Sequence, residues 1–97
     1  MTQEGFVQRG YRVTGRVQGV FFRVWTQELA QELDLRGWVR NRADGSVEAR
    51  AMGKTEAIRV LEQRLWEGPP AAAVDGVELV QSSEDLPDGP FQVLPTA

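Results

Sequence analysis

Hydrophobic positions along this 97-residue chain repeat with two different periods, which predicts that strands alternate with helices. In residues 6–15, Tyr11 and Val13 share one face and polar residues occupy the other, as in a half-buried strand. The same alternation recurs in residues 46–52. The pattern also predicts strands over residues 38–41 and 74–80, and a short last strand over 91–94.

Two longer segments instead repeat hydrophobic residues every three or four positions. Trp25, Leu29 and Leu33 form one stripe, which predicts a helix over residues 23–35 with Gly37 as its stop signal. A second helical stripe, within residues 54–67, consists of Ile58, Leu61 and Leu65.

The order of these elements predicts the fold class. The dipeptide Asp44-Gly45 is typical of a hairpin, because glycine accepts the positive φ of the turn, so the strands around it should pair antiparallel. The order β-α-β-β-α-β is that of a ferredoxin-like α+β sandwich, with a four-stranded antiparallel sheet and two helices on one face. Because no linker or repeat interrupts the pattern, we expect residues 1–97 to form a single domain.

The composition excludes several kinds of catalytic and metal site. The chain contains neither cysteine nor histidine, which excludes thiolate nucleophiles, disulfides and zinc sites built from these residues. The usual general base near neutral pH is absent too, so chemistry that depends on positioning and electrostatics, such as phosphoryl transfer, fits best. No apolar run approaches the roughly 20 residues of a membrane helix, and residues 1–5 show no signal pattern. We therefore expect a cytoplasmic protein without a membrane partner.

The net charge of −3 is unevenly distributed. Residues 1–50 carry eight arginines and six acidic residues, whereas residues 51–97 carry three basic and eight acidic residues. A local positive field on an acidic body suits a small anion better than a long nucleic acid.

The segment Gly15–Arg23, with the sequence GRVQGVFFR, joins the first predicted strand to the first helix. A loop that opens a helix presents unpaired N–H groups, and Gly15 and Gly19 allow the backbone to curve so that several converge. Arg23 adds a fixed fork of donors that matches phosphate oxygens. The segment is therefore a candidate phosphate cradle, although a tight turn followed by an ordinary surface arginine fits these residues equally well.

Asn41 ends the second predicted strand, just before the hairpin turn. Its amide could hold a water molecule without ionising. Turn formation is the simpler explanation for an isolated asparagine at this place.

Taken together, the two segments resemble the acylphosphatase family. Gly15–Arg23 matches its first signature, which reads Gly-x-Val-Gln-Gly-Val, any residue, an aromatic residue, then Arg. Residues 37–41, with Gly45, Val47 and Gly53, match its second signature at the same spacing. The resemblance covers essentially the whole chain, and the family's fold agrees with the one predicted above.

This resemblance implies hydrolysis of the carboxyl–phosphate anhydride of acyl phosphates, for which the family's substrates include small acyl phosphates and carbamoyl phosphate. It implies two catalytic residues, Arg23 to hold the phosphate and Asn41 to orient the attacking water. No metal or cofactor is implied. The implied substrate-binding residues, which act through their backbone, are Arg16, Val17, Gln18, Gly19, Val20, Phe21 and Phe22.

Other functions compete with this one. A non-catalytic ferredoxin-like module that binds an anion or a protein would keep the cradle and give Asn41 no chemistry. An RNA-binding sheet is disfavoured, because the chain is acidic and lacks a basic-aromatic stripe. The residues Gly53-Lys54-Thr55 resemble the end of a P-loop, but Glu48 stands where that motif requires glycine. We expect a monomer with a small-molecule substrate and no nucleic-acid partner.

Several further residues have expected roles. Phe21 and Phe22 should anchor the cradle loop to the core, and Trp25 and Trp38 should pack in the core. Gln18 either ties the loop together or touches substrate. Three arginines either widen the positive field or are ordinary surface charges: Arg16, Arg40 and Arg42.

Overall fold

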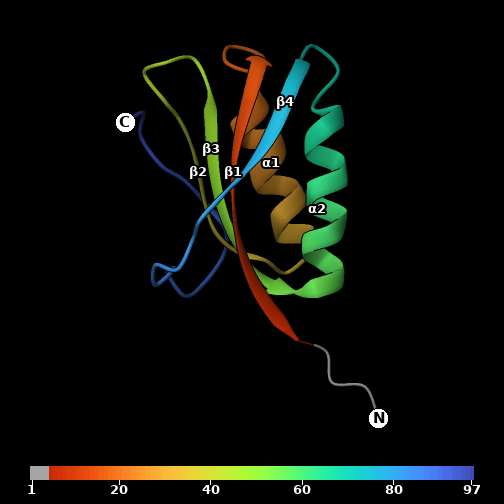
Figure 1. The fold of residues 1–97 in the computed structure, drawn as a ribbon, viewed down its shortest axis with the longest axis vertical. Helices are drawn as coiled ribbons and strands as arrows, with labels where there is room; N and C mark the ends of the chain where they lie inside the picture. Colours follow the sequence, from red (N-terminus) through yellow and green to blue (C-terminus); the bar gives the residue numbers. More distant parts are fainter. Residues whose placement is uncertain (1–4) are drawn as a thin grey trace.

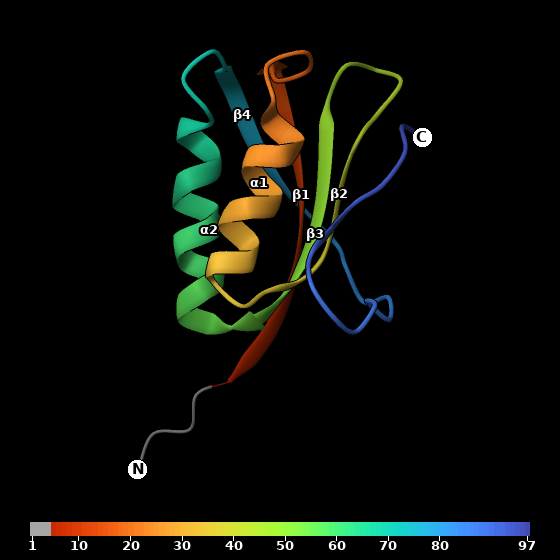
Figure 2. The same cartoon turned by 180° about the vertical axis from the view of Figure 1, so that it is seen from behind.

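The computed structural model describes residues 5–97, so Met1–Glu4 lie outside the described part of the chain. Both helices pack against the same face of one twisted sheet (Figures 1 and 2). In chain order the elements are β1 (Phe6–Arg16), α1 (Phe22–Glu32), β2 (Arg36–Asn41), β3 (Val47–Lys54), α2 (Thr55–Glu67), β4 (Ala73–Val80) and β5 (Gln92–Val93).

The predicted fold class is confirmed, but one detail of the sheet was wrong. The strand order is β4-β1-β3-β2-β5, and the first four of these strands pair antiparallel as expected. The short β5 adds a fifth strand, parallel to β2, with Val39 opposite Val93. Beyond it, the Leu94 N–H donates to the Val39 carbonyl at 2.9 Å. A two-residue strand is too short to show a period of two, so the sequence pattern did not reveal this pairing.

The first helix also ends earlier than predicted, and Gly37 does not stop it. Asp34 adopts a left-handed backbone (φ +57°), and the Leu35 N–H donates back to the Ala30 carbonyl at 2.9 Å, which closes the helix. Gly37 instead lies inside β2 at φ +136°, where a side chain would collide with the Arg50 carbonyl. No helix in residues 5–97 has the length and apolar character needed to span a bilayer.

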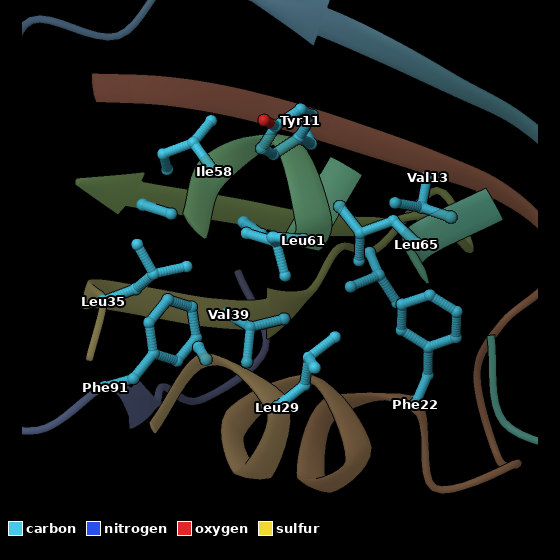
Figure 3. Packing of buried hydrophobic residues seen from close by; sticks show 14 of the residues in the cluster. Tyr11, Val13, Phe22, Leu29, Leu35, Val39, Ile58, Leu61, Leu65 and Phe91 are labelled. Carbon is cyan, nitrogen blue, oxygen red and sulfur yellow. The ribbon is translucent and has the colours of Figure 1, made fainter. Parts of the chain in front are cut away.

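The core fills the space between the sheet and the two helices (Figure 3). Tyr11 and Val13 of β1 are fully buried, as their alternation predicts. Trp25 lies half-buried at the edge of the core. Trp38 is buried, but it lies outside this core, because neighbouring Val39 faces the helices and strand neighbours face opposite sides. The other residues of the core cluster include Phe22, Leu29, Leu35, Ile58, Leu61, Leu65 and Phe91.

Candidate functional site

A pocket of about 320 Å³ lies where the β1–α1 loop meets the end of β2. Figure 1 shows that this loop and the β2–β3 turn lie at the same end of the molecule. The pocket brings together Arg23 and Asn41, the two residues with predicted catalytic roles. Among residues 5–97, those that line it are Val17, Gly19, Phe21, Phe22, Arg23, Val24, Asn41 and Val93.

The β1–α1 loop turns through two left-handed backbone positions. Gly19 has φ +76°, and apart from its chain neighbours no heavy atom of residues 5–97 lies within 4 Å of where its side chain would begin, so glycine is needed there for conformation, not for space. Phe21 has φ +65° and is the residue that precedes α1. A left-handed backbone is unfavourable for an aromatic residue, so the loop holds Phe21 in a strained conformation.

The N-terminus of α1 is open toward the pocket. The Trp25 N–H is the first to bond within the helix, to the Phe21 carbonyl at 3.0 Å, so the N–H groups of Phe22, Arg23 and Val24 precede the helical hydrogen bonds. No side chain of residues 5–97 caps this end by a hydrogen bond, and the first turn contains no acidic residue. The free N–H groups and the helix dipole both favour an anion here.

Gln18 ties the loop to the β2–β3 turn. Its side-chain amide donates to the backbone carbonyls of Arg42 and Ser46, both at 2.8 Å. Of the two roles that the sequence left open, tying the loop in place is therefore the one observed. Because Arg42 follows Asn41 directly, these bonds fix the loop relative to the end of β2.

Arg23 extends from the first turn of α1 and is half-buried in the pocket wall. Within residues 5–97, its guanidinium has neither an ion pair nor a hydrogen bond. The residues beside it are anchored, since Val17 and Phe22 are only 1% and 2% exposed. Figure 3 shows the Phe22 ring reaching from the start of α1 toward Leu65 of α2. Buried residues of the loop and of the start of α1 thus hold a guanidinium that is available to a ligand.

Asn41 is the last residue of β2 and pairs with Val47 of β3. Its backbone carbonyl accepts a hydrogen bond from the Ala97 N–H at 3.1 Å. The side-chain Oδ1 is buried and has no hydrogen-bond partner among the described residues. An unpaired buried acceptor costs about 1–3 kcal/mol, so this oxygen favours any donor that enters the pocket, such as a water molecule.

Neither of the arginines beside Asn41 lines the pocket, and both bond to Glu48. Arg40 Nε and Arg42 Nη1 lie 3.0 Å and 2.8 Å from Glu48 Oε1, and Arg50 Nη2 lies 2.7 Å from Glu48 Oε2. We call these four residues the Glu48 cluster. Burial by itself raises the pKa of Glu48, but hydrogen bonds from Arg42, Arg40 and Arg50 outweigh it and hold the pKa below its ordinary value. Arg40 and Arg42 are therefore ion-paired rather than simple surface charges.

Three predicted substrate-binding residues do not line the pocket: Arg16, Gln18 and Val20. The prediction that Phe21 anchors the loop to the core was wrong, because its side chain is 81% exposed. The left-handed backbone points this ring outward while Phe22 takes the buried position. Sequence reasoning also missed Val24 and Val93. Val93 reaches the pocket because β5 pairs with β2, and no sequence motif predicted this pairing.

A larger hollow of about 410 Å³ lies between β1 and α2. Its Glu62 accepts a hydrogen bond from the Tyr11 hydroxyl at 3.2 Å, and its Arg59 lies 3.8 Å from Glu56. The smaller pocket is the better candidate site, because it combines an open helix N-terminus with two polar side chains that the described residues leave unpaired.

A family model described as acylphosphatase matches residues 9–93. The chain belongs to the acylphosphatase family. A curated acylphosphatase from Sinorhizobium medicae (strain WSM419) is 49% identical over 79 residues, which cover 80% of this chain and 84% of that protein.

Solved structures of the family superpose closely on the chain. An acylphosphatase from Coxiella burnetii is 42% identical, with a TM-score of 0.85 over 97% of this chain and 100% of that one. The acylphosphatase from Bacillus subtilis is 33% identical, with a TM-score of 0.84 over 93% of this chain and 99% of that one.

Proposed function

We propose that this chain hydrolyses the carboxyl–phosphate anhydride of small acyl phosphates in the pocket between the β1–α1 loop and β2. The observation that carries the proposal is a pair of available polar groups in one pocket of an acylphosphatase family member. These groups are the Arg23 guanidinium and the buried Asn41 Oδ1. Arg23 and the backbone of the 16–22 loop, of which Val17, Gly19, Phe21 and Phe22 line the pocket, bind the phosphate. Asn41 orients the attacking water.

The phosphate-binding role of Arg23 follows from its donors and position. A guanidinium presents paired N–H groups that match two phosphate oxygens, and the first N–H groups of α1 supply further donors to the same anion. In phosphoryl transfer, negative charge is spread over the equatorial phosphate oxygens in the transition state. Donors that are already held in place stabilise that charge without having to reorganise.

The water-orienting role of Asn41 requires position rather than basicity. The water oxygen bonds to phosphorus while the bond from phosphorus to the carboxyl oxygen breaks, and the electron pair leaves with the carboxylate. The proton of the water passes to a phosphate oxygen, so the products are a carboxylate and inorganic phosphate. Holding the water in line with the leaving oxygen is an entropic contribution that a fixed amide can make. This division of roles agrees with a chain that contains no histidine.

The remaining expectations belong to the same proposal. The chain acts as a monomeric single domain in the cytoplasm, without a metal, a cofactor or a nucleic-acid partner. Its acidic net charge supports the expectation that it does not bind nucleic acid.

The test is hydrolysis of benzoyl phosphate by the wild type and by Asn41→Ala. We expect kcat/KM to fall at least about 10²-fold in the variant, because the water loses its positioning group. Gln63→Ala, which removes an exposed amide on α2, is the matched control and should retain wild-type rates. Unchanged turnover in Asn41→Ala would remove its assigned role. Phosphate binding by a wild type that turns over no acyl phosphate would support the non-catalytic module instead.

A further inference from the structure

Phe21 is the unusual residue of the pocket. It lines the pocket beside Arg23, yet its side chain is 81% exposed. It also keeps a left-handed backbone, with φ +65°, although it is not glycine. Exposure of a large aromatic ring and strain in its backbone both oppose folding. Neither feature is explained by packing, since the adjacent Phe22 occupies the core position.

Phosphate binding through backbone N–H groups does not require a phenylalanine at position 21. The backbone N–H of this position would be present with any side chain except proline. The ring must therefore be explained by something other than the phosphate.

The pocket has a polar part and an apolar part. Arg23 and Asn41 are the polar residues of its lining, and the apolar residues of its lining that are not fully buried are Phe21, Val24 and Val93. Val24 is 48% exposed, and Val93 is half-buried. A phosphate gains nothing from an apolar wall, because all its oxygens need donors. The carbon skeleton of an acyl group is the part of the substrate that such a wall would bind.

We propose that Phe21 is a specificity-determining residue, whose ring packs with Val24 and Val93 against the acyl group. The ring favours an aromatic acyl group over an acetyl or carbamoyl group. The proposal rests on the proposed function, since it places the acyl group beside a phosphate held at Arg23. Aromatic rings packed against one another gain an interaction beyond simple burial of area. Acetyl and carbamoyl groups are too small to cover the ring.

The first experiment compares kcat/KM for benzoyl phosphate and acetyl phosphate in the wild type, Phe21→Ala, Phe21→Leu and Phe21→Tyr. In Phe21→Ala the loss on benzoyl phosphate should exceed the loss on acetyl phosphate by about 3- to 10-fold, chiefly through KM, because the ring lies away from the reacting phosphorus. Phe21→Leu should fall between, and Phe21→Tyr should keep the wild-type ratio. Trp66→Ala removes another exposed aromatic, on α2, and should leave both substrates unaffected.

A second experiment separates this proposal from the proposed function. Calorimetric binding of phenylphosphonate and methylphosphonate measures preference for the organic group without turnover. The wild type should bind phenylphosphonate about 3- to 10-fold more tightly, and Phe21→Ala should remove the difference. If the wild type hydrolyses neither acyl phosphate but keeps this Phe21-dependent preference, hydrolysis is refuted and the apolar subsite stands. Equal losses on both substrates in Phe21→Ala, or no aromatic preference in the wild type, would overturn the role of Phe21.

Discussion

The candidate pocket and the Glu48 cluster both adjoin the end of β2 and both contain arginine, but they leave their polar groups in opposite states. In the cluster, Arg40, Arg42 and Arg50 all bond to one buried carboxylate. In the pocket, Arg23 and the Oδ1 of Asn41 find no partner within residues 5–97.

This difference separates groups that stabilise the fold from groups that are available to a ligand. A buried charge that is paired and hydrogen-bonded has been satisfied by the protein itself. A buried acceptor without a partner is unfavourable for folding, so its presence is better explained by what enters the pocket. Substitutions should therefore separate activity from stability between the two regions, which meet where Asn41 lies between Arg40 and Arg42.

The largest expected effect is on activity, in Arg23→Lys. Lysine keeps the charge but loses the planar fork of donors, so kcat/KM for benzoyl phosphate should fall at least about 10²-fold. The free energy of unfolding should change by less than about 0.5 kcal/mol, because Arg23 has no ion pair or side-chain hydrogen bond to lose among the described residues. Steady-state kinetics and urea unfolding measure the two quantities on the same preparation.

Arg40→Lys is the matched control, because Arg40 precedes Asn41 but bonds to Glu48 and stacks 4.7 Å from the Trp38 ring centre. It should lose some stability and retain activity within about threefold. Near-normal kinetics in Arg23→Lys would mean that charge alone suffices at the pocket.

A smaller effect, on stability, is expected for Glu48→Gln. The variant removes the carboxylate that three arginines share, and Glu48 is only 8% exposed. The free energy of unfolding should therefore fall by about 2 kcal/mol at pH 7. The loss is smaller than for a fully buried ion pair, because Arg40 and Arg42 are partly exposed to water. Benzoyl phosphate hydrolysis below the unfolding transition should stay within about threefold of the wild type.

The difference in unfolding free energy between the wild type and Glu48→Gln should depend on pH. Since the pKa of Glu48 is lower in the folded protein than in the unfolded chain, the carboxylate stabilises the fold above the unfolded value of about 4.3. That contribution is lost as the pH falls through the folded pKa. The difference in unfolding free energy between wild type and Glu48→Gln should therefore shrink in acid. A difference that is constant from neutral to acidic pH would show that the charge of Glu48 contributes nothing.

The contrast between the regions also shows what the sequence could predict. The fold class and the pairing of β2 with β3 followed from periodicity and from Asp44-Gly45, because these signals are local. The meeting of Arg23 with Asn41 followed from the two signatures. The sequence did not predict which arginines are ion-paired, because strand alternation and the β2–β3 register bring the three partners of Glu48 to it.

Two features of the pocket could not be predicted from the sequence for a similar reason. The sequence analysis expected both Phe21 and Phe22 to anchor the loop to the core. The structure shows that Phe21, with its left-handed backbone, is exposed and that only Phe22 is buried. Val93 enters the pocket through a two-residue parallel pairing across the edge of β2. Both depend on backbone geometry that composition does not encode locally.

The smallest expected effect is on the stability of Asn41→Ala, and it has the opposite sign to that of Glu48→Gln. Removing the amide deletes a buried oxygen that no described residue satisfies, so the free energy of unfolding should stay the same or rise by up to about 1 kcal/mol. The backbone bond from Ala97 to the Asn41 carbonyl is kept in the variant. Urea unfolding without added phosphate is the measurement, since an anion in the pocket would stabilise the folded state by binding. A loss above about 1 kcal/mol would place Asn41 with the Glu48 cluster, as a residue retained for the fold rather than for a ligand.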